Sequence, residues 1–311
     1  MNALPRRTAN GPDIDRSWTV AELLAWTNDR FERAGIEFAR LDAEWLLANA
    51  LECTRLDLYL RHDVVVSLDG RARLRELVRR RLNHEPVAYI EGKKAFHALD
   101  LELFVDARVL VPRPETEHLV DWVLERLRPP PAPVTHVLDV GTGSGAIALA
   151  VKHARPDVHV VAVDIDADAL EVARHNRDRL GLDIELSMSD LLANVAVPGQ
   201  GFAAVAGNLP YVPSHVIAGL AADVRDHEPR RALDGGPDGL TLVSRLIEQF
   251  ASRPVLASGG WLYLEVGDTQ ADTVVLLLEQ AGFLDVSIRR DLAGLQRIVS
   301  GRWDVMPGPS S

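Results

Sequence analysis

Residues 134–145 carry the first pattern in the chain that is suited to chemistry. They read Val-Thr-His-Val-Leu-Asp-Val-Gly-Thr-Gly-Ser-Gly, which places glycines at positions 141, 143 and 145, directly after a mostly apolar run. The apolar stretch 146–151 predicts a helix packed back onto a buried strand. Glycine lets a ligand approach the backbone without a Cβ in the way, and free N–H groups at the start of a helix attract an anion. The segment therefore predicts a nucleotide-type pocket.

An acidic residue, Asp164, follows at the end of a second apolar run, residues 158–163. A carboxylate about twenty residues after a glycine-rich turn is placed to accept hydrogen bonds from both hydroxyls of a ribose. A glycine-rich turn by itself can be only a tight backbone turn. Strand, turn, helix, strand and acid in this order favour a nucleoside site.

The residue just before the glycines, Asp139, narrows the class of ligand. The spacing is Gly-x-Gly-x-Gly and not the Gly-x-Gly-x-x-Gly of dinucleotide-binding enzymes. A carboxylate near the turn repels a pyrophosphate but attracts a cation, and S-adenosylmethionine carries an ammonium and a sulfonium group. We therefore expect S-adenosylmethionine as the cofactor of a methyltransferase. The residues expected to bind it at this turn and the following strand are Asp139, Gly141, Thr142, Gly143, Ser144, Gly145 and Asp164.

A third strand, expected over residues 184–188, extends the same pocket. Asp190 and Leu191 follow its carboxyl end, which is the edge where ligands bind in sheets of this kind. They are candidates to hold the adenine ring and its amino group. Asn208, at the end of a fourth strand, completes the set of residues expected at the cofactor.

The second chemical pattern is Asn208-Leu209-Pro210-Tyr211, which follows the apolar run 202–206. An asparagine beside a proline can be a simple turn former. In the functional interpretation, the Asn208 side-chain oxygen and the Leu209 carbonyl both accept hydrogen bonds from one substrate NH₂ group, and Pro210 restrains Leu209 to extended dihedrals. Tyr211 is then expected to stack on a flat amide or base. Such a site catalyses by position and by charge stabilisation, with no nucleophile or metal.

The elements that must position these residues form two domains. From residue 134 to 301 strands and helices alternate, which predicts an α/β fold: a doubly wound, mostly parallel sheet with helices on both faces. Residues 17–84 read as a small helical domain, whose helices are expected from Thr19, over 41–51 with Trp45 buried, and over 68–82. Residues 85–133 are expected to form a β-hairpin and a proline-rich linker. Residues 1–16 and 302–311 are expected to be tails.

Composition bounds the function of the 311-residue chain. A formal charge of -11 disfavours unspecific binding to nucleic acid. The one cysteine, Cys53, excludes an intrachain disulfide and suits a reducing compartment. No apolar run reaches the length of about 20 residues needed to span a bilayer, so we expect a cytoplasmic protein without a membrane partner. The run Arg79, Arg80 and Arg81 is expected to be a solvated face, and His227 with its acidic neighbours a loop and not a metal site.

At these residues the chain resembles class I methyltransferases, specifically the glutamine N5-methyltransferases of the HemK type. These enzymes modify peptide chain release factors, and a sister group acts on a ribosomal protein. The resemblance covers nearly the whole chain. Its motifs are the glycine-rich turn with Asp164, the 208–211 segment, the helical N-terminal domain, Val-Pro-Arg-Pro-Glu-Thr-Glu at 111–117, Glu-Pro at 228–229, Ala-Leu-Asp-Gly-Gly-Pro-Asp-Gly-Leu at 232–240, and Glu-Val-Gly at 265–267. The resemblance implies a glutamine amide as substrate and places Arg113 and Glu115 near it.

One position departs from that family: Leu209 stands where its motif Asn-Pro-Pro-Tyr has proline. Asn-Leu-Pro-Tyr also resembles the corresponding motif of ribosomal RNA adenine dimethylases, so an RNA enzyme is the competing hypothesis. The acidic charge, the N-terminal position of the helical domain and the other motifs oppose it. Arg-Pro-Glu-Thr-Glu favours the release-factor branch, so we expect a release factor as partner and not RNA. A third hypothesis is a non-catalytic binding protein, with Leu209 as the lesion.

Overall fold

The computed structural model describes residues 16–127 and 135–304, and the chain divides into two compact units. The smaller unit comprises Met1–Gly92 and Ala222–His227, and the larger comprises Lys93–Ala221 and Glu228–Ser311. The expected tails, apart from residues 16 and 302–304, and the expected proline-rich segment 129–133 lie outside the described residues.

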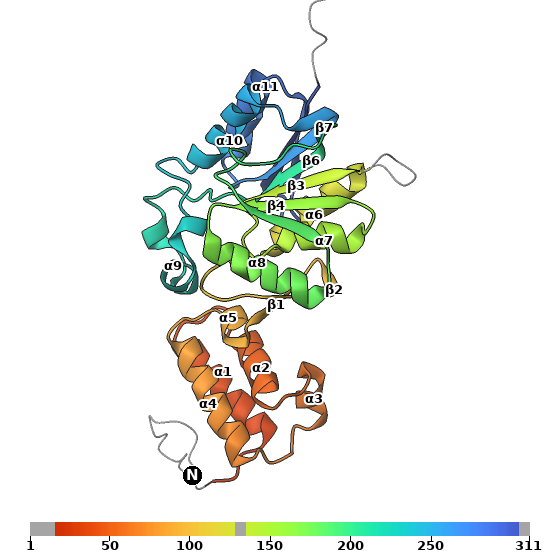
Figure 1. The fold of residues 1–311 in the computed structure, drawn as a ribbon. Helices are drawn as coiled ribbons and strands as arrows, with labels where there is room; N and C mark the ends of the chain where they lie inside the picture. The colour runs from red at the N-terminus through yellow and green to blue at the C-terminus, as the bar shows by residue number, and fades with distance from the viewer. Residues whose placement is uncertain (1–15, 128–134, 305–311) are drawn as a thin grey trace, which may run out of the picture. The chain divides into compact units, whose positions relative to one another are not determined.

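The smaller unit is helical, as the sequence predicts. Its helices are α1 Val20–Arg33, α2 Ala39–Ala50, α3 Arg55–Leu60, α4 Leu68–Leu82, α5 Val87–Glu91 and, from later in the chain, α9 Ala222–His227 (Figure 1). Helix α1 follows the predicted start, Thr19, with a capping box in which the Thr19 side chain accepts from the Glu22 amide and the Glu22 carboxylate accepts from the Thr19 amide. Phe31, Leu46 and Leu74 belong to the buried core of this unit.

Two sequence predictions in this unit are wrong. Trp45 was expected in the core, but its side chain is 41% exposed because Leu46 and Leu47 occupy the buried face of α2. The Arg55 guanidinium lies over the Trp45 ring, 5.1 Å from its centroid. Residues 87–91, expected as part of a hairpin, form the short helix α5, which ends at Gly92 in the left-handed conformation with φ of 69°.

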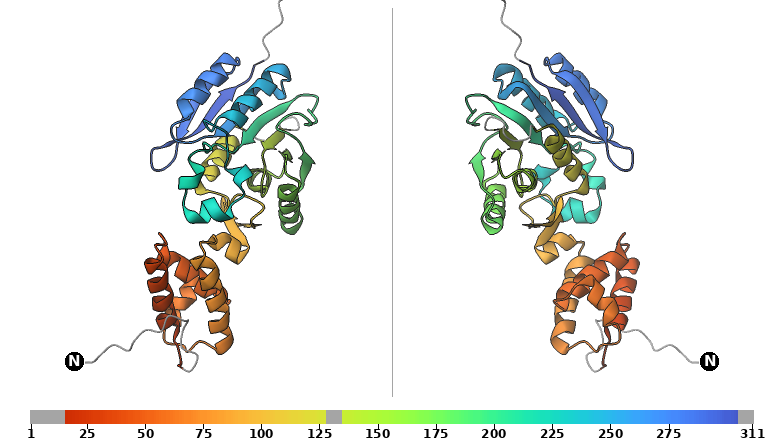
Figure 2. Two further views of the ribbon diagram at one scale, coloured as in Figure 1. Left: turned by 90° about the vertical axis from the view of Figure 1, so that its left-hand side faces the viewer. Right: turned by 90° about the vertical axis from the view of Figure 1, so that its right-hand side faces the viewer.

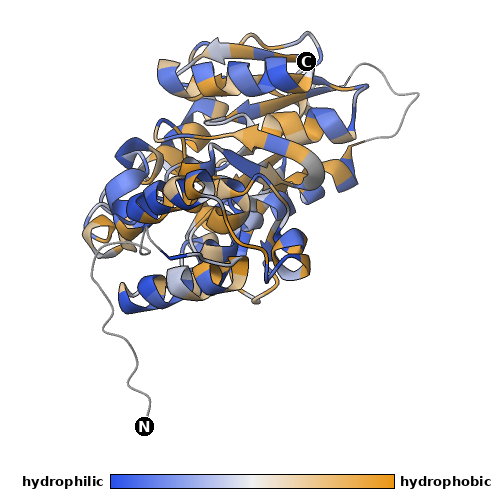
Figure 3. Cartoon of the chain, turned by 90° about the horizontal axis from the view of Figure 1, so that it is seen from below, coloured by the Kyte–Doolittle hydropathy of each residue, from blue (hydrophilic) through white to orange (hydrophobic). Residues whose placement is uncertain are grey.

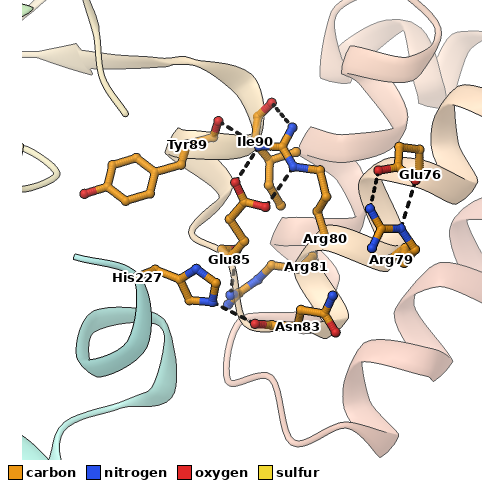
Figure 4. Close-up of polar contacts among 9 residues, drawn as sticks. All are labelled: Glu76, Arg79, Arg80, Arg81, Asn83, Glu85, Tyr89, Ile90 and His227. Carbon is orange, nitrogen blue, oxygen red and sulfur yellow. Dashed lines mark hydrogen bonds and ion pairs between the residues drawn. The ribbon is translucent and has the colours of Figure 1, made fainter. Parts of the chain in front are cut away.

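The three arginines at the end of α4 make different polar contacts (Figure 4). Arg79 is exposed and pairs with Glu76, as expected of a solvated face. Arg80 pairs with Glu85, and it also donates to two backbone carbonyl groups. Arg81 is buried, which corrects the prediction for this residue.

Arg81 is buried because two acidic side chains surround its guanidinium. Its Nε donates to Asp42 Oδ2 at 2.7 Å, and its Nη2 lies 3.6 Å from Asp223 Oδ2 on α9. A second contact holds α9 in the same unit: a ring nitrogen of His227 lies 2.8 Å from the Asn83 carbonyl oxygen (Figure 4). Buried charges are tolerated when they are paired in this way.

The larger unit is built on a sheet of seven strands in the order β5-β4-β3-β6-β7-β9-β8. Neighbours are parallel from β5 to β7, and β9 is antiparallel to β7 and β8, so the predicted doubly wound, mostly parallel sheet is confirmed. The strands are β3 His136–Val140, β4 His159–Asp164, β5 Ile184–Met188, β6 Phe202–Gly207, β7 Leu256–Glu265, β8 Leu284–Arg290 and β9 Gln296–Arg302. A hairpin of β1 Lys93–Phe96 and β2 Ala98–Phe104 precedes it.

Helices cover both faces of this sheet (Figures 1 and 2). They are α6 Pro114–Arg126, α7 Ala146–Ala154, α8 Ala167–Leu180, α10 Thr241–Ser252 and α11 Ala271–Gln280. Successive residues of β3 serve opposite faces: Leu138 joins the core formed with α10 and α11, whereas Val137 joins the core formed with α6 and α7. Figure 3 shows hydrophilic and hydrophobic residues alternating along the helices. Each helix can therefore bury one face and leave the other in water.

None of the helices within residues 16–127 and 135–304 combines the length and the apolarity that crossing a membrane requires.

Candidate active site

A cavity of about 190 Å³ opens in the larger unit, at the carboxyl ends of its parallel strands. Four loops meet there, one after each of β3, β4, β5 and β6, because parallel strands all end at the same edge of the sheet. The predicted site residues that line the cavity are Gly141, Thr142, Gly143, Ser144, Asp164, Asp190, Leu191, Asn208, Leu209, Pro210 and Arg113. Those that do not line it are Asp139, Gly145, Tyr211 and Glu115.

The glycine-rich loop after β3 is held against the end of β4. The Gly141 amide donates to the Val163 carbonyl at 2.9 Å, and the Gly143 amide donates to Asp164 Oδ2 at 2.9 Å. Gly143 has a φ of 56°, and a Cβ built on it would meet nothing within 4 Å, so it would project into open space. The backbone is therefore approachable there, as a bound S-adenosylmethionine requires.

Asp139 is buried under this loop, and only 1% of the residue is exposed. Its Oδ2 accepts from the Thr142 hydroxyl at 2.6 Å and from the Ala148 amide at 3.2 Å. Burial raises the pKa of Asp139 to about 7, so near neutral pH the group is only partly ionised. Asp139 was predicted to face the ligand as an ionised carboxylate, but it is buried and ties the loop to α7.

Asp164 lies at the cavity wall with both carboxylate oxygens oriented. Its Oδ2 accepts from the Gly143 amide and its Oδ1 accepts from the Asp166 amide, each at 2.9 Å. Each carboxylate oxygen can accept a further hydrogen bond. Burial raises the pKa of this carboxyl group above its usual range, and the two amide donors oppose that shift. A fixed acid of this kind suits a diol such as a ribose.

Replacing Asp164 by alanine is expected to weaken binding of S-adenosylmethionine by about 1.5–3 kcal/mol, which is the scale of hydrogen bonds to a charged group. Titration calorimetry measures this affinity directly. Asp178→Ala is the matched control, because Asp178 is exposed on α8 and pairs with its neighbour Arg177. Wild-type donor affinity in Asp164→Ala would contradict the assignment.

The loop after β5 contacts Arg245, a cavity residue that was not predicted from the sequence. Arg245 on α10 lines the cavity, and its Nη2 donates to Asp190 Oδ2 at 2.7 Å. This ion pair fixes the orientation of the Asp190 carboxylate at the cavity wall. Beside it, Leu191 is 7% exposed. Arg245 lies on a helix far along the chain from Asp190, so local spacing did not indicate it.

The loop after β6 places Asn208 at the cavity and connects it to two buried polar groups. Asn208 Nδ2 donates to the Thr116 hydroxyl at 3.0 Å, and that hydroxyl donates to Glu265 Oε2 at 2.6 Å. Thr116 also lines the cavity. Sequence reasoning did not single out either partner, although both lie in motifs quoted for the family resemblance, at 111–117 and 265–267.

The remaining residues of this loop differ in their surroundings. Leu209 is 3% exposed and joins the core that contains Val140 and Leu240, so the residue that departs from the family motif has an apolar environment. Tyr211 directs its hydroxyl toward Glu265 Oε1 at 3.4 Å and lies outside the cavity lining. Burial raises the pKa of Tyr211 well above its usual range. The stacking role predicted for Tyr211 therefore has no support from the cavity lining.

Arg113, at the cavity wall, is held by the buried carboxylate of Glu228. Its Nη2 donates to Glu228 Oε1 at 2.6 Å, and Glu228 is 5% exposed. Glu228 therefore bonds to Arg113, whereas the neighbouring Asp226 pairs with Arg225. The structure brings Arg113 to the cavity wall, whereas Glu115 lies outside the lining.

Comparison with known proteins decides the family. The PrmC N-terminal domain family matches residues 22–92, and the methyltransferase small domain family matches residues 120–222. A release factor glutamine methyltransferase of Rhodopirellula baltica is 43% identical over 293 residues, which cover 92% of this chain and 97% of that protein. The chain belongs to the release factor glutamine methyltransferase family.

Further relatives agree with this membership. A protein of the same name from Geobacter sulfurreducens is 38% identical over 286 residues, covering 92% of this chain and 97% of that protein. Among solved structures, the hMettl16 catalytic domain in complex with the MAT2A 3'UTR hairpin 6 has a TM-score of 0.52 at 15% identity, covering 67% of this chain and 77% of that one. At that identity the likeness shows the fold alone. The class I methyltransferase fold expected from the sequence is confirmed, and the protein is a methyltransferase.

Proposed function

We propose that this family member transfers a methyl group from S-adenosylmethionine to the side-chain amide nitrogen, N5, of a glutamine in a peptide chain release factor. The observation that carries the proposal is the meeting of two loops in one cavity: the glycine-rich loop with Asp164, and the acceptor loop with Asn208 and Leu209. The names of relatives 38% and 43% identical over almost the whole chain support the substrate.

The residues of the site fit the donor. Gly143 leaves the backbone open to a ligand, Asp164 offers oriented carboxylate oxygens to a diol, and Asp190 offers an acceptor to an amino group. When bound, S-adenosylmethionine supplies a methyl group activated by a sulfonium. The residues of the chain must hold the substrate amide nitrogen in line with the methyl carbon and the sulfur.

Asn208 and Leu209 are suited to that work. An amide nitrogen is a poor nucleophile, so alignment is the main contribution that a site can make. The Asn208 side-chain oxygen and the Leu209 carbonyl oxygen accept the two N–H groups of one substrate amide. These bonds strengthen as positive charge develops on the nitrogen, which favours the transition state over the ground state. Transfer breaks the sulfonium–methyl bond and forms one nitrogen–methyl bond, and one amide proton then passes to water, so the product of one transfer is a singly methylated glutamine.

The identity of the substrate is tested by offering three substrates in parallel. The full-length protein is incubated with labelled S-adenosylmethionine and either a release factor, isolated ribosomal proteins or bare ribosomal RNA. We expect mass analysis of the release factor to show one added methyl group on a glutamine. A formal charge of -11 offers few phosphate contacts, so the RNA arm is expected to stay unlabelled.

Each other outcome overturns part of the proposal. Methylated ribosomal protein with unmodified release factor would move the enzyme to the sister group. Methylated adenine in the RNA would show that Asn-Leu-Pro-Tyr at 208–211 outweighs the other motifs. Donor binding without turnover in any arm would indicate a binding protein that has lost catalysis.

A further inference from the structure

Asn208 is linked through Thr116 to Glu265, and all three residues come from different elements of the larger unit. Glu265 is the last residue of β7 and is 1% exposed, and Thr116 lies on α6 and is 4% exposed. Strands β6 and β7 are adjacent and pair Gly207 with Leu264, so the next residues, Asn208 and Glu265, lie at the same edge of the sheet. Thr116 bridges the two side chains from the helix packed on that face.

The direction of the hydrogen bonds in this chain follows from the donor count. An ionised carboxylate can only accept, and a threonine hydroxyl has a single hydrogen to donate. The 2.6 Å contact from Thr116 Oγ1 to Glu265 Oε2 uses that hydrogen. Thr116 then offers Asn208 only lone pairs, so the amide must turn its NH₂ group to Thr116. Oδ1 is left as the Asn208 atom that can accept a hydrogen bond from a ligand in the cavity.

We propose that Thr116 and Glu265 are positioning residues that set the orientation of the Asn208 amide, so that its oxygen and not its NH₂ group faces the substrate. This inference rests on the proposed function in one respect, namely that the substrate presents an NH₂ group. It applies equally to a glutamine amide and to an adenine amino group.

The opposite orientation shows why the direction matters. A protonated Glu265 has a hydrogen to donate, and it can donate it to the Thr116 hydroxyl. Thr116 can then donate its own hydrogen to Asn208 Oδ1, which turns the Asn208 NH₂ group toward the cavity. Two NH₂ groups facing each other cannot form a hydrogen bond, and a desolvated donor without an acceptor is costly. Transfer therefore needs the ionised form of Glu265.

Several groups act on the charge of Glu265. Burial raises the pKa of Glu265 to about 7, and the negative charge of Glu115 on α6 acts in the same direction. The hydroxyl groups of Thr116 and Tyr211 and the positive charge of Arg297 on β9 oppose that rise. For an acid, the ionised fraction grows as pH increases through its pKa. The rate of transfer is therefore expected to rise with pH around 7 in the wild-type protein.

Thr116→Val and Thr116→Ser separate this role from simple packing. Valine keeps the shape of threonine but removes the hydroxyl, and serine keeps the hydroxyl. With saturating release factor and S-adenosylmethionine, we expect Thr116→Val to lower kcat about tenfold, the scale of one lost hydrogen bond, with KM and donor affinity within about twofold of wild type. Thr116→Ser is expected to retain kcat within about twofold.

The pH profile gives the second readout. In Thr116→Val no hydroxyl links Glu265 to Asn208, so ionisation of Glu265 no longer affects the orientation of the Asn208 amide. The rise of kcat around pH 7 is therefore expected to disappear. Asp139 also titrates near this pH, but both Thr116 variants leave its contacts in place. A difference between their pH profiles and that of wild type therefore reports the effect of Glu265 that depends on Thr116.

Three results overturn the inference: unchanged kcat in Thr116→Val, a fall in kcat that leaves the pH-dependent rise intact, and a Thr116→Ser variant as slow as Thr116→Val. Failure of the proposed function is distinguished earlier, because the wild-type protein would then methylate no release factor. If wild type methylates only another NH₂-bearing substrate, the same variants are compared on that substrate.

Discussion

Replacing Asn208 by alanine is expected to lower the rate of methyl transfer by about a hundredfold or more, while binding of S-adenosylmethionine stays near the wild-type value. The variant removes the side-chain oxygen that we propose aligns the substrate NH₂ group and takes up its developing charge. It leaves the glycine-rich loop and Asp164 in place, since neither hydrogen-bonds to the Asn208 side chain. Single-turnover kinetics with a release factor, together with calorimetry of the donor, separate the two effects.

A matched control for this experiment is Asn194→Ala, because Asn194 is exposed in the loop after β5 and lies outside the cavity lining. Its turnover is expected to equal that of wild type. If Asn208→Ala also keeps full turnover, Asn208 is only a turn former and the acceptor role belongs elsewhere. If donor binding falls as much as the rate does, Asn208 acts through the cofactor and not through the substrate.

Replacing Arg81 by alanine is expected to lower the free energy of unfolding of the smaller unit by about 3–5 kcal/mol, the cost of removing one partner from a buried ion pair. The variant leaves Asp42 and Asp223 without the cation between them. Burial raises the pKa of Asp42, and the charge of Arg81 opposes that rise, so the pKa rises further in the variant. Hydrogen exchange of α2 and α4 amides in the full-length protein measures the loss.

The pH dependence of this loss has a definite sign. An acid whose folded pKa lies above its unfolded value binds more protons in the folded state, so stability falls as pH rises between the two values. The Arg81→Ala variant is therefore expected to lose less stability as the pH is lowered and Asp42 becomes protonated. Arg79→Ala is the control: this arginine is exposed and pairs with Glu76 at the surface, so its loss should cost far less than the loss of Arg81. Equal effects of the two variants would contradict the buried pair.

Local patterns in the sequence were sufficient to predict most of the elements. A helix was predicted to start at Thr19, where the capping box begins α1, and the strand predicted over residues 184–188 matches β5. Such features depend on residues a few positions apart, whose spacing reports which face of an element is apolar. Short elements escaped this reasoning, because α3 and α5 contain too few residues to show a helical period.

Short local patterns pointed to several residues that line the cavity, but not to those that reach the site from far along the chain. The glycine-rich loop, Asp164 and Asn208 line the cavity as expected. Thr116 is 92 residues from Asn208, and Glu265 is 54 residues from Tyr211. No local pattern relates either residue to the loop at 208–211. Arg245 reaches Asp190 across a similar separation.

The sequence by itself therefore determined the family, the kind of pocket and the succession of strands and helices along the chain, because each is encoded in local periodicity and short motifs. Only the tertiary structure decided the environment of individual polar groups. Whether Asp139 faces a ligand or lies beneath a loop, and whether Arg81 is solvated or buried, depends on which elements pack against it. Strand order and register place Asn208 and Glu265 at the same edge of the sheet, where Thr116 links their side chains by hydrogen bonds.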